Sequence, residues 1–339
     1  MINNEIHEIT ICGGGSLGLV CAAVFLEKGL NVNLLTGHPG DWNKNICVAD
    51  YNGKLYKGTL NVISNNPQMV IPNSDLVFLT LPGFLIEDIL SEIKPYLKKD
   101  TIVGSVVSST GFFFAAHKIL NSNQCIFGFQ RVPFIARQHK YGESGELLGY
   151  KPKLHVCLES CDRPDLLKIL EWLFNMPIEQ LDNFYEASLT NSNPILHTGR
   201  LYTMWQNYDG EVYSTQSLFY ADWNDEASEL LLKMDDEFQK LLKALGLREG
   251  AIPSLLQYYE SSDASTLTQK IKNIPAFKSI KSPMIKIESG WIPDFKSRYF
   301  TEDFPYGLRY IKELAETHNI QTPNIDMVYN WGIKHVNVN

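Results

Sequence analysis

Short apolar runs alternate with helix-length amphipathic segments over the first half of the chain. Uninterrupted apolar runs predict strands buried on both faces, and their alternation with helices predicts an α/β fold with a doubly wound parallel sheet. Gly29 is placed to end the first helix. The expected strands are residues 8–12, 30–36, 76–81, 101–107, 125–129, 153–158 and 178–181, with helices at 17–28, 112–120 and 164–174 and a helical stretch ending at 97.

Two other patterns differ from this alternation. Residues 46–64 alternate around Asn52-Gly53, which predicts a β-hairpin. After residue 182 the pattern becomes helical, with a long amphipathic helix at 222–245 and further helices at 304–319 and 325–335. The sequence therefore predicts a first domain of residues 1–182 and a second, mostly helical domain of residues 183–339.

A glycine cluster follows the first predicted strand. Gly13, Gly15 and Gly18 form the pattern GxGxxG between a strand and a helix, and a second strand follows. In a Rossmann dinucleotide-binding domain these glycines permit a tight turn, close approach of a pyrophosphate and close packing of helix on strand. Ser16 and Leu17 belong to the same expected cofactor site. The alternative is a glycine-rich turn in another kind of α/β protein.

The sequence does not decide between NAD and NADP. The second strand ends at Thr36, followed by Gly37 and His38. NAD-specific domains usually carry an acidic residue at this position, and this chain has none there. It also has no arginine nearby that could bind the 2′-phosphate of NADP. Leu81 and Pro82 end another strand at the same expected edge of the sheet and are predicted to lie beside the cofactor.

Composition and charge exclude several protein classes. The 339 residues suit two domains, and the formal net charge of −8 argues against nucleic-acid binding. No apolar stretch approaches the roughly 20 residues of a membrane span, and the acidic N-terminus does not resemble a signal peptide. The six cysteines include no CxxC pair, so we expect reduced, mostly buried thiols, no metal site and a cytoplasmic location.

The second domain offers a histidine where related enzymes use lysine. Ketopantoate reductases, glycerol-3-phosphate dehydrogenases and 3-hydroxyacid dehydrogenases use a lysine near the start of their helical domains, but no lysine occurs here between Lys168 and Lys233. His197 lies in that interval and can supply a proton near neutral pH. The alternative is a histidine satisfied within the core.

Four segments together resemble the octopine (opine) dehydrogenase family, over essentially the whole chain. They are CGGGSLG, FGFQRVPFIAR, NSNPILH and RYFTEDFPYGL. The resemblance implies that His197 pairs with Asp303, which would fix the imidazole tautomer while the other ring nitrogen gives a proton to a carbonyl or imine. The alternative for Asp303 is a helix cap before Pro305.

The resemblance also implies substrate-binding residues. Arg298 is suited to a bidentate contact with a carboxylate, with a surface salt bridge as the alternative. Gln130 and Arg131 end a strand at the expected cleft and would face the nicotinamide and the oxo acid, and Asn193 belongs to the histidine segment. Core packing or subunit contact, rather than a substrate cage, is expected for the aromatic residues Trp205, Tyr208, Tyr213, Phe219, Tyr220 and Trp223.

The sequence thus predicts an NAD(P)H-dependent opine-type dehydrogenase. It would condense the amine of an amino acid with a 2-oxo acid such as pyruvate and reduce the resulting imine. Alternatives are a simple oxo-acid reductase that uses the same pair of residues, and a non-enzymatic dinucleotide sensor. The expected partners are small molecules, neither nucleic acid nor membrane. The identity of the amino acid and the formation of a homodimer stay open.

Overall fold

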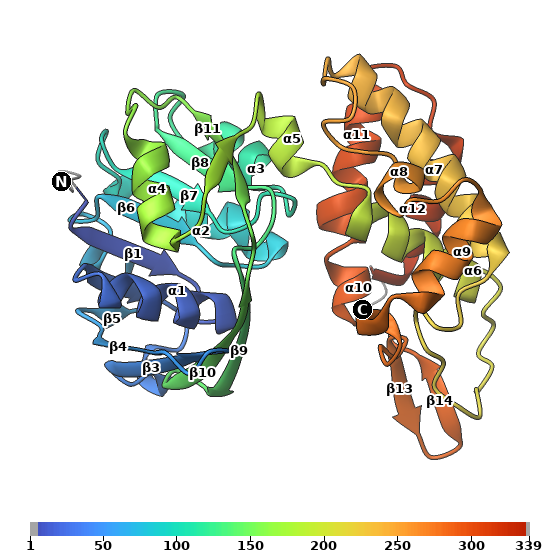
Figure 1. The fold of residues 1–339 in the computed structure, drawn as a ribbon, viewed down its shortest axis with the longest axis horizontal. Coiled ribbons are helices and arrows are strands. Elements are labelled where there is room, and N and C mark those ends of the chain that lie inside the picture. The colour runs from blue at the N-terminus through green and yellow to red at the C-terminus, as the bar shows by residue number, and fades with distance from the viewer. Residues whose placement is uncertain (1–5, 337–339) are drawn as a thin grey trace. The chain divides into compact units, whose positions relative to one another are not determined.

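The computed structural model describes residues 6–336, and the chain divides into two compact units between Ser188 and Leu189 (Figure 1). This division lies six residues beyond the expected domain boundary at 182. The reason is the short helix α5 (Phe184–Ser188), which packs against strand β11 and helix α3 of the first unit.

The first unit is built on an eight-stranded sheet whose centre is parallel. Strand β1 pairs with β2 on one side and β6 on the other, and β6, β7 and β8 continue in the same direction. The strands, in order across the sheet, are β12 (Ile178–Gln180), β11 (Leu154–Glu159), β8 (Ile126–Phe129), β7 (Ile102–Ser105), β6 (Leu76–Leu79), β1 (Glu8–Cys12), β2 (Asn31–Leu35) and β5 (Ile63–Ser64). Its helices are α1 (Ser16–Glu27), α2 (Ile86–Ile93), α3 (Phe112–Ile119), α4 (Leu166–Phe174) and α5.

The predicted α/β fold class is confirmed, but one edge of the sheet departs from the expected parallel order. Strand β11 runs antiparallel to β8, and β12 runs parallel to β11. Parallel neighbours need a crossover connection that returns the chain to the same edge. Between β8 and β11 the chain instead forms the hairpin of β9 (Phe134–Lys140) and β10 (Ser144–Tyr150), and it enters the large sheet again in the opposite direction.

A second sheet covers helix α1 on the side away from β1 (Figure 1). It has the order β4-β3-β10-β9 and combines the predicted hairpin, β3 (Asn45–Asp50) and β4 (Leu55–Thr59), with the unpredicted β9–β10 hairpin. Gly53 has φ +83°, as expected for the turn between β3 and β4. Because sheets lie on both sides of α1, its residues from Gly18 to Phe25 are all buried, which explains a helix apolar all round.

The second unit is mostly helical. The long helix α7 (Asp225–Ala244) begins after Asn224, whose side chain accepts a hydrogen bond from the Ala227 amide, and it packs against α6, α9, α11 and α12. The other α-helices are α6 (Thr198–Trp205), α8 (Leu255–Tyr258), α9 (Ala264–Asn273), α10 (Arg298–Thr301), α11 (Arg309–Thr317) and α12 (Pro323–Val336). The strands β13 (Met284–Ile287) and β14 (Gly290–Pro293) form a small hairpin that the sequence did not predict.

Two π-helical turns complete this unit, Ser192–His197 before α6 and Phe304–Leu308 before α11. Each contains a proline, which cannot donate the usual backbone hydrogen bond, and wider turns of this kind occur frequently at functional sites. The turns pack on each other: a Cβ on Gly307 would lie 2.9 Å from Cγ of Pro194. The absence of a side chain at Gly307 therefore allows the two turns to approach.

Candidate active site

The glycine loop between β1 and α1 has the geometry of a dinucleotide-binding turn. Gly13 has φ +119°, and a Cβ there would lie 2.7 Å from Oγ1 of Thr80, so both the turn and its neighbours require glycine. A Cβ on Gly18 would lie 2.0 Å from the carbonyl oxygen of Gly13, so the third glycine lets α1 pack on the loop. Thr80, in the strand end that the sequence places beside the cofactor, donates a hydrogen bond to that same carbonyl at 3.1 Å.

Gly15 differs from the other two glycines because a Cβ there would meet nothing within 4 Å. The open space belongs to a pocket whose lining includes Gly13, Gly15, Thr36 and Leu81. Gly15 also stands at the amino end of α1, where unpaired amides and the positive end of the helix dipole favour an anion. These residues fit the pyrophosphate of a bound NAD(P), which supplies hydride chemistry when present.

The remaining residues predicted for the cofactor site have mixed surroundings. Thr36 is 7% exposed and lines the pocket. The Ser16 hydroxyl accepts a hydrogen bond from the Gln138 amide at 3.1 Å and so ties the start of α1 to β9. Leu17 packs partly against the core, and Pro82 begins the turn that leads toward α2.

The second unit brings His197 and Asp303 together. Nδ1 of His197 lies 2.8 Å from Oδ2 of Asp303, and the two side chains are only 14% and 15% exposed. His197 ends the first π-turn and Asp303 immediately precedes the second, so the contact between the turns sets this distance. Because a carboxylate accepts hydrogen bonds, the pairing places a proton on Nδ1 and leaves Nε2 as the ring nitrogen with an acceptor lone pair.

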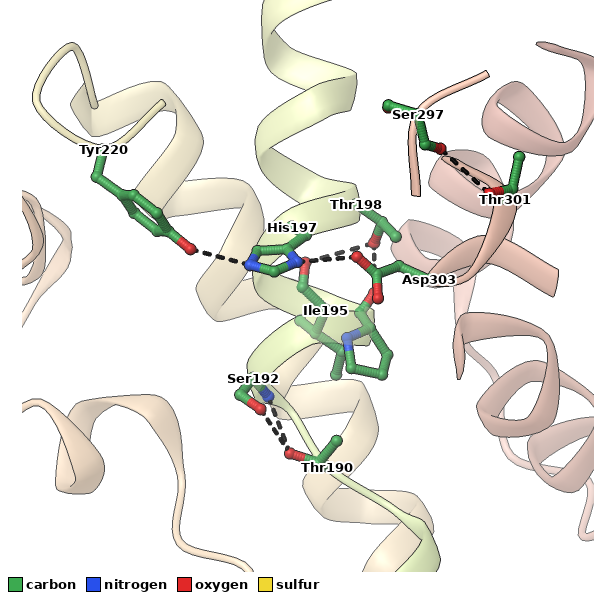
Figure 2. A network of polar contacts seen from close by, with 10 residues as sticks. Thr190, Ser192, Ile195, His197, Thr198, Tyr220, Ser297, Thr301 and Asp303 are labelled. Atoms are coloured by element: carbon green, nitrogen blue, oxygen red, sulfur yellow. Dashed lines mark hydrogen bonds and ion pairs between the residues drawn. The ribbon is translucent and has the colours of Figure 1, made fainter. Parts of the chain in front are cut away.

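Asp303 does not cap the helix that follows it. Its side chain makes no capping hydrogen bond, and its carboxylate is directed to His197 (Figure 2). The geometry therefore excludes the capping alternative.

A buried carboxylate binds the segment that precedes His197. Asp235 on α7 accepts hydrogen bonds from the Asn191 side chain at 2.8 Å and from the Leu255 amide at 2.7 Å. Burial raises the pKa of Asp235, while these hydrogen bonds oppose the shift. Asp235 thus holds the residue that directly precedes the first π-turn.

Aromatic side chains enclose the His197 ring. The ring centroid of Tyr299 lies 4.8 Å from that of His197, and Phe219 contacts it edge-on at 5.6 Å. Nε2 of His197 lies 2.9 Å from the hydroxyl oxygen of Tyr220. Figure 2 shows Tyr220 and Asp303 on opposite sides of the imidazole.

Tyr220 is a site residue that the sequence analysis missed. It is buried, as expected of a core aromatic residue, but it also contacts the candidate proton donor. No local pattern marks this contact, because Tyr220 lies in a loop and reaches His197 only through the fold.

The predicted substrate-binding residues lie in both units. In the second unit, Asn193 and Arg298 are exposed, Asn193 on the π-turn of His197 and Arg298 directly before Tyr299. In the first unit, Gln130 donates from Nε2 to the Glu186 carbonyl oxygen at 2.8 Å, and the Arg131 side chain is exposed. The amide oxygen of Gln130 is therefore the group it offers to a ligand.

The expectation of reduced thiols is wrong for two cysteines. Cys125 precedes β8 and Cys161 follows β11, and the antiparallel register of these strands brings them into a disulfide. Cys12 and Cys21 are free and fully buried, and burial raises their pKa, so they act as packing groups.

Two further observations concern residues 6–336. This part of the chain contains no cluster of three or more His, Cys, Asp or Glu side chains suited to binding a metal ion. None of its helices combines the length and apolar character needed to cross a lipid bilayer.

Known proteins match both units. Residues 180–335 match the family described as NAD/NADP octopine/nopaline dehydrogenase, alpha-helical domain, and residues 9–139 match ketopantoate reductase PanE/ApbA. Tauropine dehydrogenase from Arabella iricolor is 26% identical over 96% of this chain and 90% of its own length. Octopine dehydrogenase from Mizuhopecten yessoensis is 25% identical over 96% of this chain and 88% of its own.

The fold is also found in a solved structure. Octopine dehydrogenase with NADH and L-arginine superposes with a TM-score of 0.87 at 23% identity, covering 97% of this chain and 89% of that one.

Proposed function

This chain belongs to the opine dehydrogenase family of NAD(P)-dependent oxidoreductases, and we propose that its His197–Asp303 pair drives condensation of an amino acid with a 2-oxo acid such as pyruvate. The observation that carries the proposal is the 2.8 Å contact between Nδ1 of His197 and Asp303. The pair is the arrangement that an acid–base histidine needs: one nitrogen fixed by a carboxylate and the other left to exchange a proton.

Proton balance defines the work of this pair. An ammonium group, an oxo acid, NAD(P)H and one proton give a secondary ammonium product, NAD(P)⁺ and water. In the reducing direction, His197 accepts a proton as the amine attacks the carbonyl and returns it as the carbonyl oxygen leaves as water. Asp303 keeps the ring oriented and stabilises the imidazolium formed between these steps.

The substrate carboxylates require separate binding groups. Arg298 is exposed beside Tyr299, and its planar guanidinium can hold the oxo-acid carboxylate through two parallel hydrogen bonds. Asn193 and Arg131 are exposed polar side chains that we assign to substrate binding, and the Gln130 amide oxygen can accept from the amine.

A simple oxo-acid reductase is the second candidate, because residues 9–139 match ketopantoate reductase. The two functions differ in their need for an amine. A reductase oxidises NAD(P)H with the oxo acid alone, whereas an opine-type enzyme requires both substrates.

The decisive experiment measures oxidation of NADH and NADPH with pyruvate and other 2-oxo acids, each with and without every amino acid. We expect turnover only in the presence of an amine and an N-carboxyalkyl amino acid as product, identified by mass spectrometry. Turnover without amine would establish the reductase. Tight cofactor binding without turnover on any pair would favour the sensor.

A further inference from the structure

We propose that the hydroxyl of Tyr220 is the group through which His197 exchanges its proton with the substrate, so that Asp303, His197 and Tyr220 form a three-membered relay. The inference rests on the proposed function. Both ring nitrogens of His197 have a partner: Nδ1 lies 2.8 Å from Asp303, and Nε2 lies 2.9 Å from the Tyr220 hydroxyl oxygen. Each ring nitrogen has one in-plane hydrogen-bonding position, so both positions of His197 are filled.

Tyr220 is held firmly in this place. It is 5% exposed, and its ring stacks on Phe277 at a centroid distance of 4.2 Å and an interplanar angle of 20°. Trp223 lies on it nearly parallel, with a centroid distance of 6.1 Å and an angle of 6°. Swinging the side chain away would break these aromatic contacts, so the substrate cannot readily displace the hydroxyl from Nε2.

Arg200 fixes the backbone on both sides of Tyr220. Its Nε donates to the Phe219 carbonyl oxygen at 3.2 Å, and its terminal nitrogen donates to the Asp222 carbonyl oxygen at 2.7 Å. Its guanidinium also lies 5.3 Å from the centre of the Trp223 ring. Burial lowers the pKa of Arg200 to about 10, which still leaves it charged at neutral pH. Arg200 is therefore a positioning residue that keeps the tyrosine loop against His197.

The chemistry of the phenol suits a relay. Burial, with smaller effects of neighbouring acidic groups, raises the pKa of Tyr220, so the hydroxyl keeps its proton at neutral pH. A hydroxyl can donate one hydrogen bond while accepting another. In the protonating step, the proton on Nε2 passes to the Tyr220 oxygen while the phenolic proton passes to the substrate oxygen that leaves as water. His197 ends neutral with its proton on Nδ1, and the phenol is unchanged.

The test replaces Tyr220 with phenylalanine, which keeps the ring stacking and removes only the hydroxyl. We expect kcat for amine plus oxo acid to fall by roughly 10²-fold, at the lower end of the range for a positioned proton-transfer group. The solvent deuterium isotope effect on kcat should change as well, whereas the Kd for NADH should not. Tyr208→Phe is the matched control: its ring packs on Tyr213 and Phe295, away from these groups, and its kinetics should be unaltered.

An unchanged or increased kcat in Tyr220→Phe would overturn the relay, because the substrate would then contact Nε2 directly. Nitrogen NMR of the His197 ring gives a readout that does not require turnover. We expect the Nε2 resonance to move in Tyr220→Phe while Nδ1 stays in place, and an unmoved Nε2 would also refute the proposal. Absence of wild-type turnover, by contrast, would reject the proposed function.

A separate observation concerns the choice of cofactor, and from it we infer a preference for NADH over NADPH. A Cβ on Gly14 would lie 2.9 Å from Oγ1 of Thr36, 2.9 Å from Nε1 of Trp42 and 3.2 Å from the hydroxyl of Tyr141. Neutral donors therefore lie beside the glycine loop, from Thr36 and Trp42 after β2 and from Tyr141 between β9 and β10, and such donors suit ribose hydroxyls. Trp42 is 8% exposed and packs edge-on against Tyr141.

Charge in the same pocket opposes a 2′-phosphate. Among the residues that line it there is no lysine or arginine, and His38 is its one basic side chain, whereas Asp88 and Glu92 contribute two carboxylates from one face of α2. Lys140, the residue before Tyr141, is paired with Glu143 at 2.6 Å. A phosphate dianion would thus gain no permanently charged side chain and would be repelled by the two carboxylates of α2.

Fluorescence titration of NADH and NADPH tests this inference without any need for turnover. We expect NADH to bind at least about tenfold more tightly, which corresponds to about 1.4 kcal/mol. Asp88→Asn combined with Glu92→Gln should narrow that ratio by tightening NADPH alone. Equal affinities in the wild type, or an unchanged ratio in the double variant, would overturn the inference.

Discussion

Gly15→Ala is expected to leave the stability of the cofactor-free protein almost unchanged and to remove most of the stabilisation that a bound cofactor provides. The backbone of Gly15, with φ −79° and ψ −176°, suits alanine, and its Cβ would meet nothing within 4 Å. Loss of freedom in the unfolded chain stabilises such an alanine variant by about 0.4–1 kcal/mol. Gly15 is also the N-cap of α1, where alanine is less favourable than glycine by a similar amount. The two effects oppose each other, so the Tm of the cofactor-free protein should change by no more than about 2 °C, at about 2–4 °C per kcal/mol for a unit of this size.

Adding NADH should separate the Tm values of the two proteins. The methyl group would occupy the space that receives the pyrophosphate, so the variant should lose the stabilisation by ligand. At a concentration 100 times Kd, that stabilisation is about 2.7 kcal/mol in the wild type, or roughly 5–11 °C in Tm. Thermal unfolding followed by circular dichroism, with and without NADH, measures the Tm of the free protein and the shift in Tm that NADH causes.

Gly18→Ala provides the contrasting control. Its Cβ would lie 2.0 Å from the Gly13 carbonyl oxygen, so this substitution should lower the Tm even without NADH. A substitution at the third glycine therefore cannot separate binding from folding. If Gly15→Ala instead lowered the Tm of the cofactor-free protein and kept the full shift with NADH, the assignment of the open space to the pyrophosphate would be refuted.

Three further predictions concern the second unit. His197→Ala should reduce kcat by roughly 10²–10⁴-fold with little change in NADH affinity. Adding Asp303→Asn to this variant should reduce kcat hardly any further. Multiplicative losses of kcat in steady-state kinetics would contradict a coupled pair. Arg298→Lys should raise the KM for the oxo acid, because an ammonium group cannot form a planar two-point contact; unaltered kinetics would make Arg298 structural. Gly307→Ala should push the π-turns apart at Pro194 and lower both Tm and kcat, and a fully active variant would show that this contact does not set the His197–Asp303 distance.

The parallel core of the first unit was predictable because its strands are continuous apolar runs. Strands β1, β2, β6, β7 and β8 all occur within one or two residues of the expected limits. The hairpin β9–β10 was not expected, because its segment Phe134–Lys140 carries exposed polar side chains and no strong turn signal. The direction of β11 depends on that hairpin, so the pattern of apolar residues could not reveal it.

The candidate site was likewise predictable where it depends on residues close in sequence, and less so where it depends on contacts between distant segments. The glycine loop is local in sequence, and the approach of His197 to Asp303 was implied by segments that resemble a family. The π-turns were not predicted, because Pro194 and Pro305 interrupt the helical pattern. The contact of Tyr220 with His197 joins residues from a loop and a helix start, and nothing in their spacing indicates it.

The position of α1 between two sheets restricts the motion of the glycine loop that is attached to it. Amide protons in this helix can exchange with solvent only when one of the sheets separates from it, since both of its sides are covered. We therefore expect α1 to show the slowest hydrogen exchange in the first unit, with opening as costly as unfolding of the unit itself. The loop is attached to this helix, so it should be rigid before any cofactor arrives, and cofactor association should involve no ordering step at the pyrophosphate.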